Sequence, residues 1–203
     1  MRKIVLMALC FLVLGSTAFA KDLVIGGGGL FGLTFEEYEY PASPGYLPTT
    51  HEVTEKAFGG YVFFGLSLYM EASIAVFFNK NTVVWKWYDQ NEEIYKEESH
   101  PDYPGQQVGV SLYGKWPFNL TDKLAIFPTL GLDLESQNGT MDLFLGGGVG
   151  LDYFLGKNLF LRAQGLYRAG ALYIYRGENI SKGIKTTFPA HGPLFKLGLG
   201  WVY

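Results

Sequence analysis

The last nine residues of the chain, FKLGLGWVY, alternate between large apolar side chains and mostly small or charged ones. A period of two residues is the pattern of a β-strand, whose successive side chains point to opposite faces. This segment therefore predicts a strand with two unlike faces that runs to the last residue of the sequence. The apolar face consists of Phe195, Leu197, Leu199, Trp201 and Tyr203.

Seven earlier segments repeat this alternation, each about as long as a strand that crosses a membrane at a tilt. Aromatic residues make up 17% of the chain and 27 residues are glycine, a combination that favours sheets over helices. We therefore predict an all-β fold with eight antiparallel strands in up-and-down order. The expected strands cover about 23–35, 56–64, 68–79, 107–116, 124–135, 141–154, 159–168 and 195–203.

The joins between these strands alternate in length. Those near residue 65, at 117–123 and at 155–158 are short, whereas those at 36–55, 80–106 and 169–189 are long; the join at 136–140 is a short exception. In an up-and-down barrel, alternation of this kind places short turns at one rim and long loops at the other. We expect both ends of the barrel chain at the short-turn rim.

The first twenty residues have the three parts of a secretory signal peptide. Arg2 and Lys3 precede an apolar stretch at 4–14, and the small residues Ala18 and Ala20 of the AFA sequence suit cleavage after Ala20. The mature barrel domain would then cover 21–203. Cys10, the only cysteine, leaves with the leader; lipid attachment there is disfavoured because a bulky leucine precedes it.

The distribution of size and charge predicts which face of each strand points inward. A soluble barrel would have to enclose large apolar side chains from every strand, and an eight-stranded interior is too narrow for them. The opposite faces combine glycines with the rings of Tyr69, Phe77, Tyr113 and Phe144. They also carry the charges, which we expect to form a lumen network: Glu71, Lys115, Asp133, Glu135, Asp142, Asp152, Arg162, Arg168 and Lys196.

Because the apolar faces lack charges at their central positions and have rings near their ends, they suit a lipid bilayer. The mature chain as a whole resembles the small eight-stranded outer-membrane proteins of bacteria, the group of the OmpA transmembrane domain, OmpX and OmpW. The resemblance rests on the leader, the join lengths, strand-turn-strand units such as GKWPFNLTDKLAIFPTLGLDLE, and the aromatic C-terminal strand. Pro128 departs from the pattern, and we expect a bulge or a local irregularity there.

The resemblance implies a protein of the outer membrane, in contact with its lipid and with extracellular long loops. It also implies that the C-terminal strand is the signal read by the barrel-assembly machinery. The implied role is structural or interactive. Three alternatives stay open: passage of small hydrophobic solutes as implied by OmpW, adhesion to a host ligand through the loops, and lipid modification by an enzyme of this fold.

Other sequence features predict no catalytic, cofactor or metal residues. Loss of Arg2 and Lys3 takes the net charge from −3 to −5, and no basic cluster exists, which argues against a nucleic-acid partner. GGGGLFG at 26–32 continues a strand pattern and lacks the context of a dinucleotide loop. The histidines, His51, His100 and His191, have no serine partner fixed by the sequence, although triads are defined by geometry. The acidic join reads as a solvated loop, with a cation or partner site as the alternative: Asp89, Glu92, Glu93, Glu97, Glu98 and Asp102.

Overall fold

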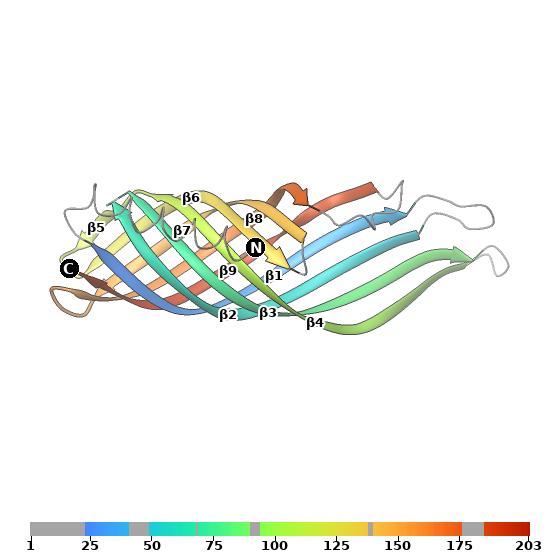
Figure 1. The fold of residues 1–203 in the computed structure, drawn as a ribbon, viewed down its shortest axis with the longest axis horizontal. Helices are drawn as coiled ribbons and strands as arrows, with labels where there is room; N and C mark the ends of the chain where they lie inside the picture. Colours follow the sequence, from blue (N-terminus) through green and yellow to red (C-terminus); the bar gives the residue numbers. More distant parts are fainter. Residues whose placement is uncertain (1–22, 41–48, 68, 90–93, 138–139, 176–184) are drawn as a thin grey trace.

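The computed structural model describes residues 23–67, apart from 41–48, then 69–89, 94–137, 140–175 and 185–203. These residues form one antiparallel sheet that is rolled around a common axis (Figure 1). The strands are β1 (Val24–Tyr40), β2 (Thr49–Ser67), β3 (Met70–Asp89), β4 (Ile94–Lys115), β5 (Phe118–Thr121), β6 (Leu124–Gln137), β7 (Thr140–Phe154), β8 (Leu159–Tyr175) and β9 (Lys185–Val202).

Eight of these strands close into a barrel. Each strand pairs with the next along the chain, except that β4 pairs with β6, and β9 closes the ring against β1. The closing ladder begins with Val24 opposite Val202, so the start of β1 and the end of β9 lie at the same rim. The predicted all-β, eight-stranded up-and-down architecture is confirmed.

The short-turn rim shows two local features that the period-two pattern does not specify. The join at 117–123 contains a ninth, four-residue strand, β5, which pairs only with β6 in the described sheet. Pro128 causes no bulge, because it pairs with Val149 without a register shift. Its carbonyl accepts a hydrogen bond from the Trp116 backbone N–H just past Lys115, where the β4–β6 ladder ends. Proline has no N–H to return that bond, so the β4–β6 ladder ends at this point.

The strands are longer than the sequence pattern predicts, and the long joins are correspondingly shorter. β3 continues to Asp89 and β4 starts at Ile94, so most of the predicted 80–106 join is a hairpin rather than a loop. β1 and β2 likewise extend into the expected 36–55 join. Figure 1 shows β3 and β4 running furthest beyond the ring. A membrane crossing needs only 9–11 residues, so these strands project well past it.

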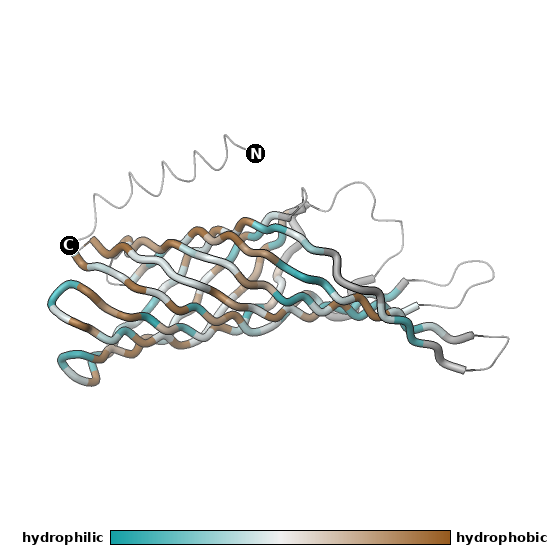
Figure 2. The backbone as a smooth tube through the Cα atoms, turned by 90° about the horizontal axis from the view of Figure 1, so that it is seen from below, coloured by the Kyte–Doolittle hydropathy of each residue, from teal (hydrophilic) through white to brown (hydrophobic). Residues whose placement is uncertain are grey.

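The outer surface of the ring is apolar. Phe58, Val62 and Leu130 keep 54%, 47% and 60% of their surface exposed, and hydrophobic positions alternate with paler ones along the barrel body in Figure 2. Lys56 and Lys80 are paired in register and exposed, at the outer margin of this apolar belt. The fold is therefore that of a transmembrane β-barrel, with the lipid-compatible face outward. Within the described residues, no helix is long and apolar enough to cross a membrane.

Two side chains on β3 and its preceding turn differ from their expected environments. Tyr69, expected in the lumen, precedes the strand and is 56% exposed. Ala72, expected on the lipid face, is buried because its small side chain lies between the larger Phe64 and Leu112 of the neighbouring strands.

Aromatic rings fill the inside of the barrel where glycines leave room for them. A β-carbon on Gly150 would lie 2.1 Å from the Phe127 ring, and one on Gly200 would lie 2.1 Å from the Phe160 ring. Such contacts are far below van der Waals distance, so these positions require glycine. The alternation of very small and very large side chains thus closes a narrow interior.

Candidate functional site: the lumen and the outer shelf

The charged side chains singled out in the sequence lie on the lumen faces of β3, β4 and β6–β9. All of them are buried except Asp142, which is half-buried. Because strand residues alternate between faces, a single register places every one of these groups inside. Their arrangement divides into a cluster near the short-turn rim, a middle layer and an upper layer.

The rim cluster contains two cations and two carboxylates. Arg162 donates from Nε and Nη2 to the two carboxylate oxygens of Asp152, each at 2.7 Å, and from Nη1 to Glu71. The Lys115 ammonium donates to Glu71 at 3.1 Å. The four charges balance, which is how buried ions persist in a low-dielectric interior.

The Arg162 guanidinium also lies among three aromatic rings. Its central carbon is 4.4 Å from the ring centroid of Phe63, 5.0 Å from that of Phe127 and 5.1 Å from that of Phe160. A guanidinium is attracted to the negative faces of such rings. Rings and ion pairs together close the lumen at this level.

The middle layer holds Lys196 and Asp133. Tyr113 donates its hydroxyl hydrogen to Asp133. The Lys196 ammonium lies 3.5 Å from the Ser73 hydroxyl oxygen and 5.4 Å from the ring centroids of Tyr61 and Tyr113. Within the described part of the chain Lys196 makes no ion pair, so aromatic rings and one hydroxyl surround its charge.

The upper layer combines an ion pair with amide contacts. Arg168 donates to Glu135 and lies 5.0 Å from the Phe144 ring centroid. Above it, Glu55 accepts hydrogen bonds from Asn79 at 2.7 Å and from Gln107 at 3.3 Å. Glu55 was not predicted as a lumen residue, because residues 36–55 were assigned to a join. Period-two alternation continued back from the buried Ala57 places Glu55 on the lumen face.

Glu55 lies beyond the outward-facing Lys56 and Lys80, outside the apolar belt. Burial raises the pKa of its carboxyl group above the ordinary value, although the hydrogen bond from Asn79 acts in the opposite direction. The nearby Glu135 carboxylate raises that pKa further. The Glu55 carboxyl group is therefore a weaker acid than a glutamate in water.

The C-terminal strand presents its apolar face to the outside. Phe195, Leu197 and Leu199 are 52%, 66% and 50% exposed, and Trp201 and Tyr203 at the rim are 43% and 68% exposed. The Tyr203 backbone N–H donates to the Leu23 carbonyl at 2.9 Å. The described strand thus ends paired to β1. The predicted cleavage point after Ala20 and the leader cysteine Cys10 lie outside the described residues.

The histidines do not gather into a catalytic group within the described residues. The His191 Nδ1 is 2.9 Å from the Pro189 carbonyl oxygen, and its ring lies 6.1 Å from that of Phe35 and 6.2 Å from that of Tyr167. A hollow of about 330 Å³ beside it has no serine or cysteine in its lining. The side chain of His100 lies outside the described part, and no metal-ligating group of three is found among the described residues.

Beyond Glu55 and Asn81, β1–β4 continue as an open sheet, with β9 paired to β1 as far as Lys185; we call this extension the outer shelf. β4 pairs with β6 only from Gln107 to Lys115, so this part of the sheet does not close into a ring. Tyr38, His51, Trp85 and Glu98 are register partners in one row across the four strands. The His51 and Trp85 rings are stacked, with centroids 4.7 Å apart and 9° between their planes.

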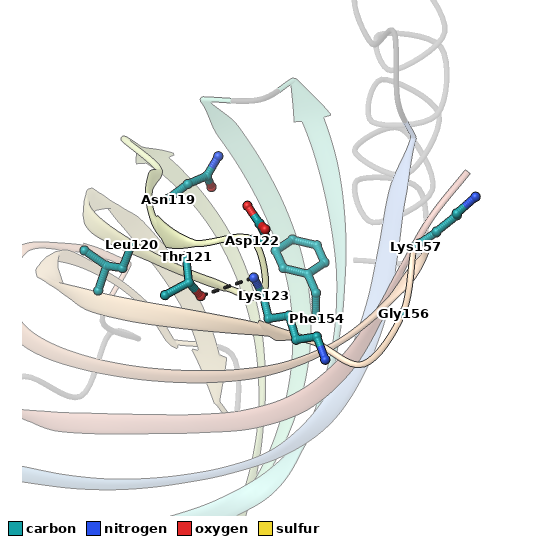
Figure 3. Close-up of a pocket in the computed structure, with 8 residues that line it drawn as sticks. All are labelled: Asn119, Leu120, Thr121, Asp122, Lys123, Phe154, Gly156 and Lys157. Atoms are coloured by element: carbon teal, nitrogen blue, oxygen red, sulfur yellow. Dashed lines mark hydrogen bonds between the residues drawn. The ribbon is translucent and has the colours of Figure 1, made fainter.

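A second hollow lies at the opposite, short-turn rim (Figure 3). It has a volume of about 830 Å³ between the β5–β6 turn and the β7–β8 turn. Figure 3 draws one hydrogen bond among the lining residues, in which the Lys123 backbone N–H donates to the Thr121 hydroxyl at 3.2 Å. The Phe154 backbone N–H also donates to the Lys123 carbonyl at 2.8 Å. Phe154 is half-buried, and the other lining residues are exposed. The hollow is a dip between two turns without a buried polar group.

The sequence matches no protein-family profile and no curated protein. The fold is similar to that of the outer membrane protein OprG from Pseudomonas aeruginosa, with a TM-score of 0.51 and 13% identity over 91% of this chain and 96% of that one. Neisserial surface protein A gives a TM-score of 0.43 and 12% identity over 90% and 97% of the two chains. The likeness to OprG bears on the fold alone, and it agrees with the transmembrane barrel described above.

Proposed function

We propose that this protein is a non-enzymatic integral protein of a bacterial outer membrane, with a closed barrel as its anchor and an interaction role at its outer shelf. The apolar belt supports the location, because a charge-free outward face of this height suits only a bilayer. The fold shared with OprG supports the same membrane. The outer shelf, on the side of the long joins, would then face the cell exterior.

One observation carries the interaction role: side chains fill the lumen, which argues against a passage through the barrel. Arg162 spans the interior between Asp152 and Glu71 and is surrounded by Phe63, Phe127 and Phe160. A conducting path would have to break charge-assisted hydrogen bonds and move three rings. We therefore assign the barrel to anchoring and the shelf to contact with other molecules.

Two measurements test this proposal together. In unheated and boiled electrophoresis of a membrane fraction, the barrel should resist SDS until it is heated and then shift in mobility. In planar bilayers the purified protein should show no steady conductance. Extraction by carbonate without a mobility shift would refute the membrane location, and stable channels would refute the closed barrel.

Passage of small hydrophobic solutes is a second candidate, favoured by one observation. Between Gly32 and Phe35 the β1–β9 ladder lacks two pairs, opposite Pro193 and Gly192. Gly192 has a φ of 155°, and a β-carbon there would lie 2.0 Å from the Leu33 carbonyl oxygen. The 330 Å³ hollow adjoins this site. Uptake of a hydrophobic dye into vesicles that is lost when a disulfide joins β1 to β9 would support passage.

We also propose that Phe195, Leu197, Leu199, Trp201 and Tyr203 form the signal read by the barrel-assembly machinery. Their exposure on the last strand of the chain, which closes the ring against β1, supports this role. The lipid-facing aromatic end is available for recognition until β9 joins β1.

A further inference from the structure

The outer shelf has two unlike faces, although neither is in the membrane. The register of β2 and β3 is unbroken from the barrel into the shelf, so the lumen face continues through Val53, His51, Val83, Trp85 and Trp87. The opposite face carries Glu37, Glu39, Glu52, Lys86 and Glu97. An aromatic face turned toward the barrel mouth is explained neither by lipid nor by a packed core.

The rings on this face are arranged as a platform. Trp85 stacks on His51 with a 9° interplanar angle and still keeps 40% of its surface exposed. Trp87 follows two residues later on the same face, which places its Cα about 7 Å from that of Trp85. Tyr38 stands in the same row on β1. A group the size of an ammonium can therefore lie within reach of more than one ring.

The charge around the platform is strongly negative. Glu98 is the register partner of Trp85, and Glu36 lies on the same face one row closer to the barrel. The hairpin sequence 82–102 holds six acidic residues and two lysines. The neighbouring strands add Glu36, Glu37, Glu39 and Glu52, against Lys185 opposite Glu39. The Lys86 ammonium is already bound by Glu52 at 2.5 Å on the other face. This surface attracts cations and repels anionic ligands.

We propose that the outer shelf binds an organic cation that carries a methylated ammonium group. Aromatic faces attract a cation through their quadrupoles, and a methylated ammonium also buries apolar surface against the rings. Glu98 supplies the complementary charge beside Trp85. The proposal deepens the interaction role and rests on it for access from outside the cell, but binding to the purified protein does not depend on location.

Choline is the probe, and the measurement is tryptophan fluorescence of the detergent-solubilised, folded protein. The titration is made at pH 8, where an ordinary imidazole is neutral, so that protonated His51 does not compete. Sodium chloride at equal concentrations serves as the ionic-strength control. We expect saturable quenching by choline, and at least tenfold weaker quenching by its neutral isostere 3,3-dimethyl-1-butanol.

The variants Trp85→Leu and Glu98→Gln should each weaken choline binding about tenfold or more. Trp116→Phe at the barrel surface and Glu39→Gln on the opposite shelf face are the matched controls, and both should bind as the parent does. The heat-induced mobility shift establishes that each variant is folded.

Equal binding of choline and its isostere, or unchanged affinity in Trp85→Leu, would overturn the proposal. Binding of glucose or a sulfated sugar in place of choline would overturn it as well and would assign the shelf to glycans. Channel activity of the same preparation would contradict the closed barrel while leaving the choline result intact, so the two hypotheses fail separately.

Discussion

Replacing Arg162 with methionine should strongly destabilise the barrel, because it leaves a buried carboxylate without its cation. The substitution keeps a flexible apolar chain among Phe63, Phe127 and Phe160 but removes both hydrogen bonds to Asp152 and the ion pair with Glu71. Glu71 retains Lys115 at 3.1 Å, whereas Asp152 loses its ion-pair partner. An uncompensated buried charge costs about 3–5 kcal/mol, and we expect a loss of that size.

The double variant Arg162→Met/Asp152→Leu separates charge from packing. It removes both members of the pair and leaves the balanced Glu71–Lys115 pair in place. Replacement of a buried ion pair by apolar residues is often close to neutral. The double variant should therefore recover most of the stability and lie within about 2 kcal/mol of the parent.

Reversible urea unfolding in lipid vesicles, followed by tryptophan fluorescence, measures these free energies. Unheated electrophoresis checks that each variant starts as a folded barrel. The reasoning about the lumen fails if Arg162→Met unfolds at the parent's urea midpoint, or if the double variant is as unstable as the single one.

Three further predictions concern packing, assembly and processing. Gly150→Leu should abolish the SDS-resistant form, because even a β-carbon there would overlap Phe127, whereas Gly29→Ala, which meets nothing closer than 3.8 Å, should retain it on the same gel. Tyr203→Asp should lower the yield of heat-modifiable protein in membranes more than a loop substitution of similar size; equal yields would remove the role of the terminal ring. Intact-mass measurement of the mature protein should give residues 21–203, and a mass that includes the leader would contradict cleavage after Ala20.

The faces of the strands could be predicted from the sequence, because period-two alternation depends only on strand geometry. Glu71, Asp133 and Lys196 are buried as their positions on the polar faces imply. Which face points inward could be predicted from side-chain size and charge, since a ring of eight strands cannot enclose an apolar face from each of them.

Partners and strand ends could not be predicted in the same way. The meeting of Arg162 with Glu71 joins residues 91 positions apart, and it depends on the stagger of the barrel rather than on any local pattern. The outer ends of the strands lie further from the membrane than predicted, because the pattern that located the strands was their row of apolar, lipid-facing side chains. Beyond Lys56 and Lys80 that row becomes polar while pairing continues.

The outer shelf follows from the unequal lengths of the strands. β3 and β4 have 20 and 22 residues, whereas β6 and β7 have 14 and 15, so only one side of the barrel is continued outward. A sheet continued on one side cannot close, and both of its faces must meet water or a ligand. If the shelf served only to carry loops away from the membrane, polar residues on both faces would suffice. The row Tyr38–His51–Trp85 instead keeps aromatic surface on the face toward the barrel mouth, with the carboxylate of Glu98 at its end. Aromatic surface that is exposed to water has an unfavourable hydration free energy. An organic cation bound beside Glu98 would cover that surface and remove this cost.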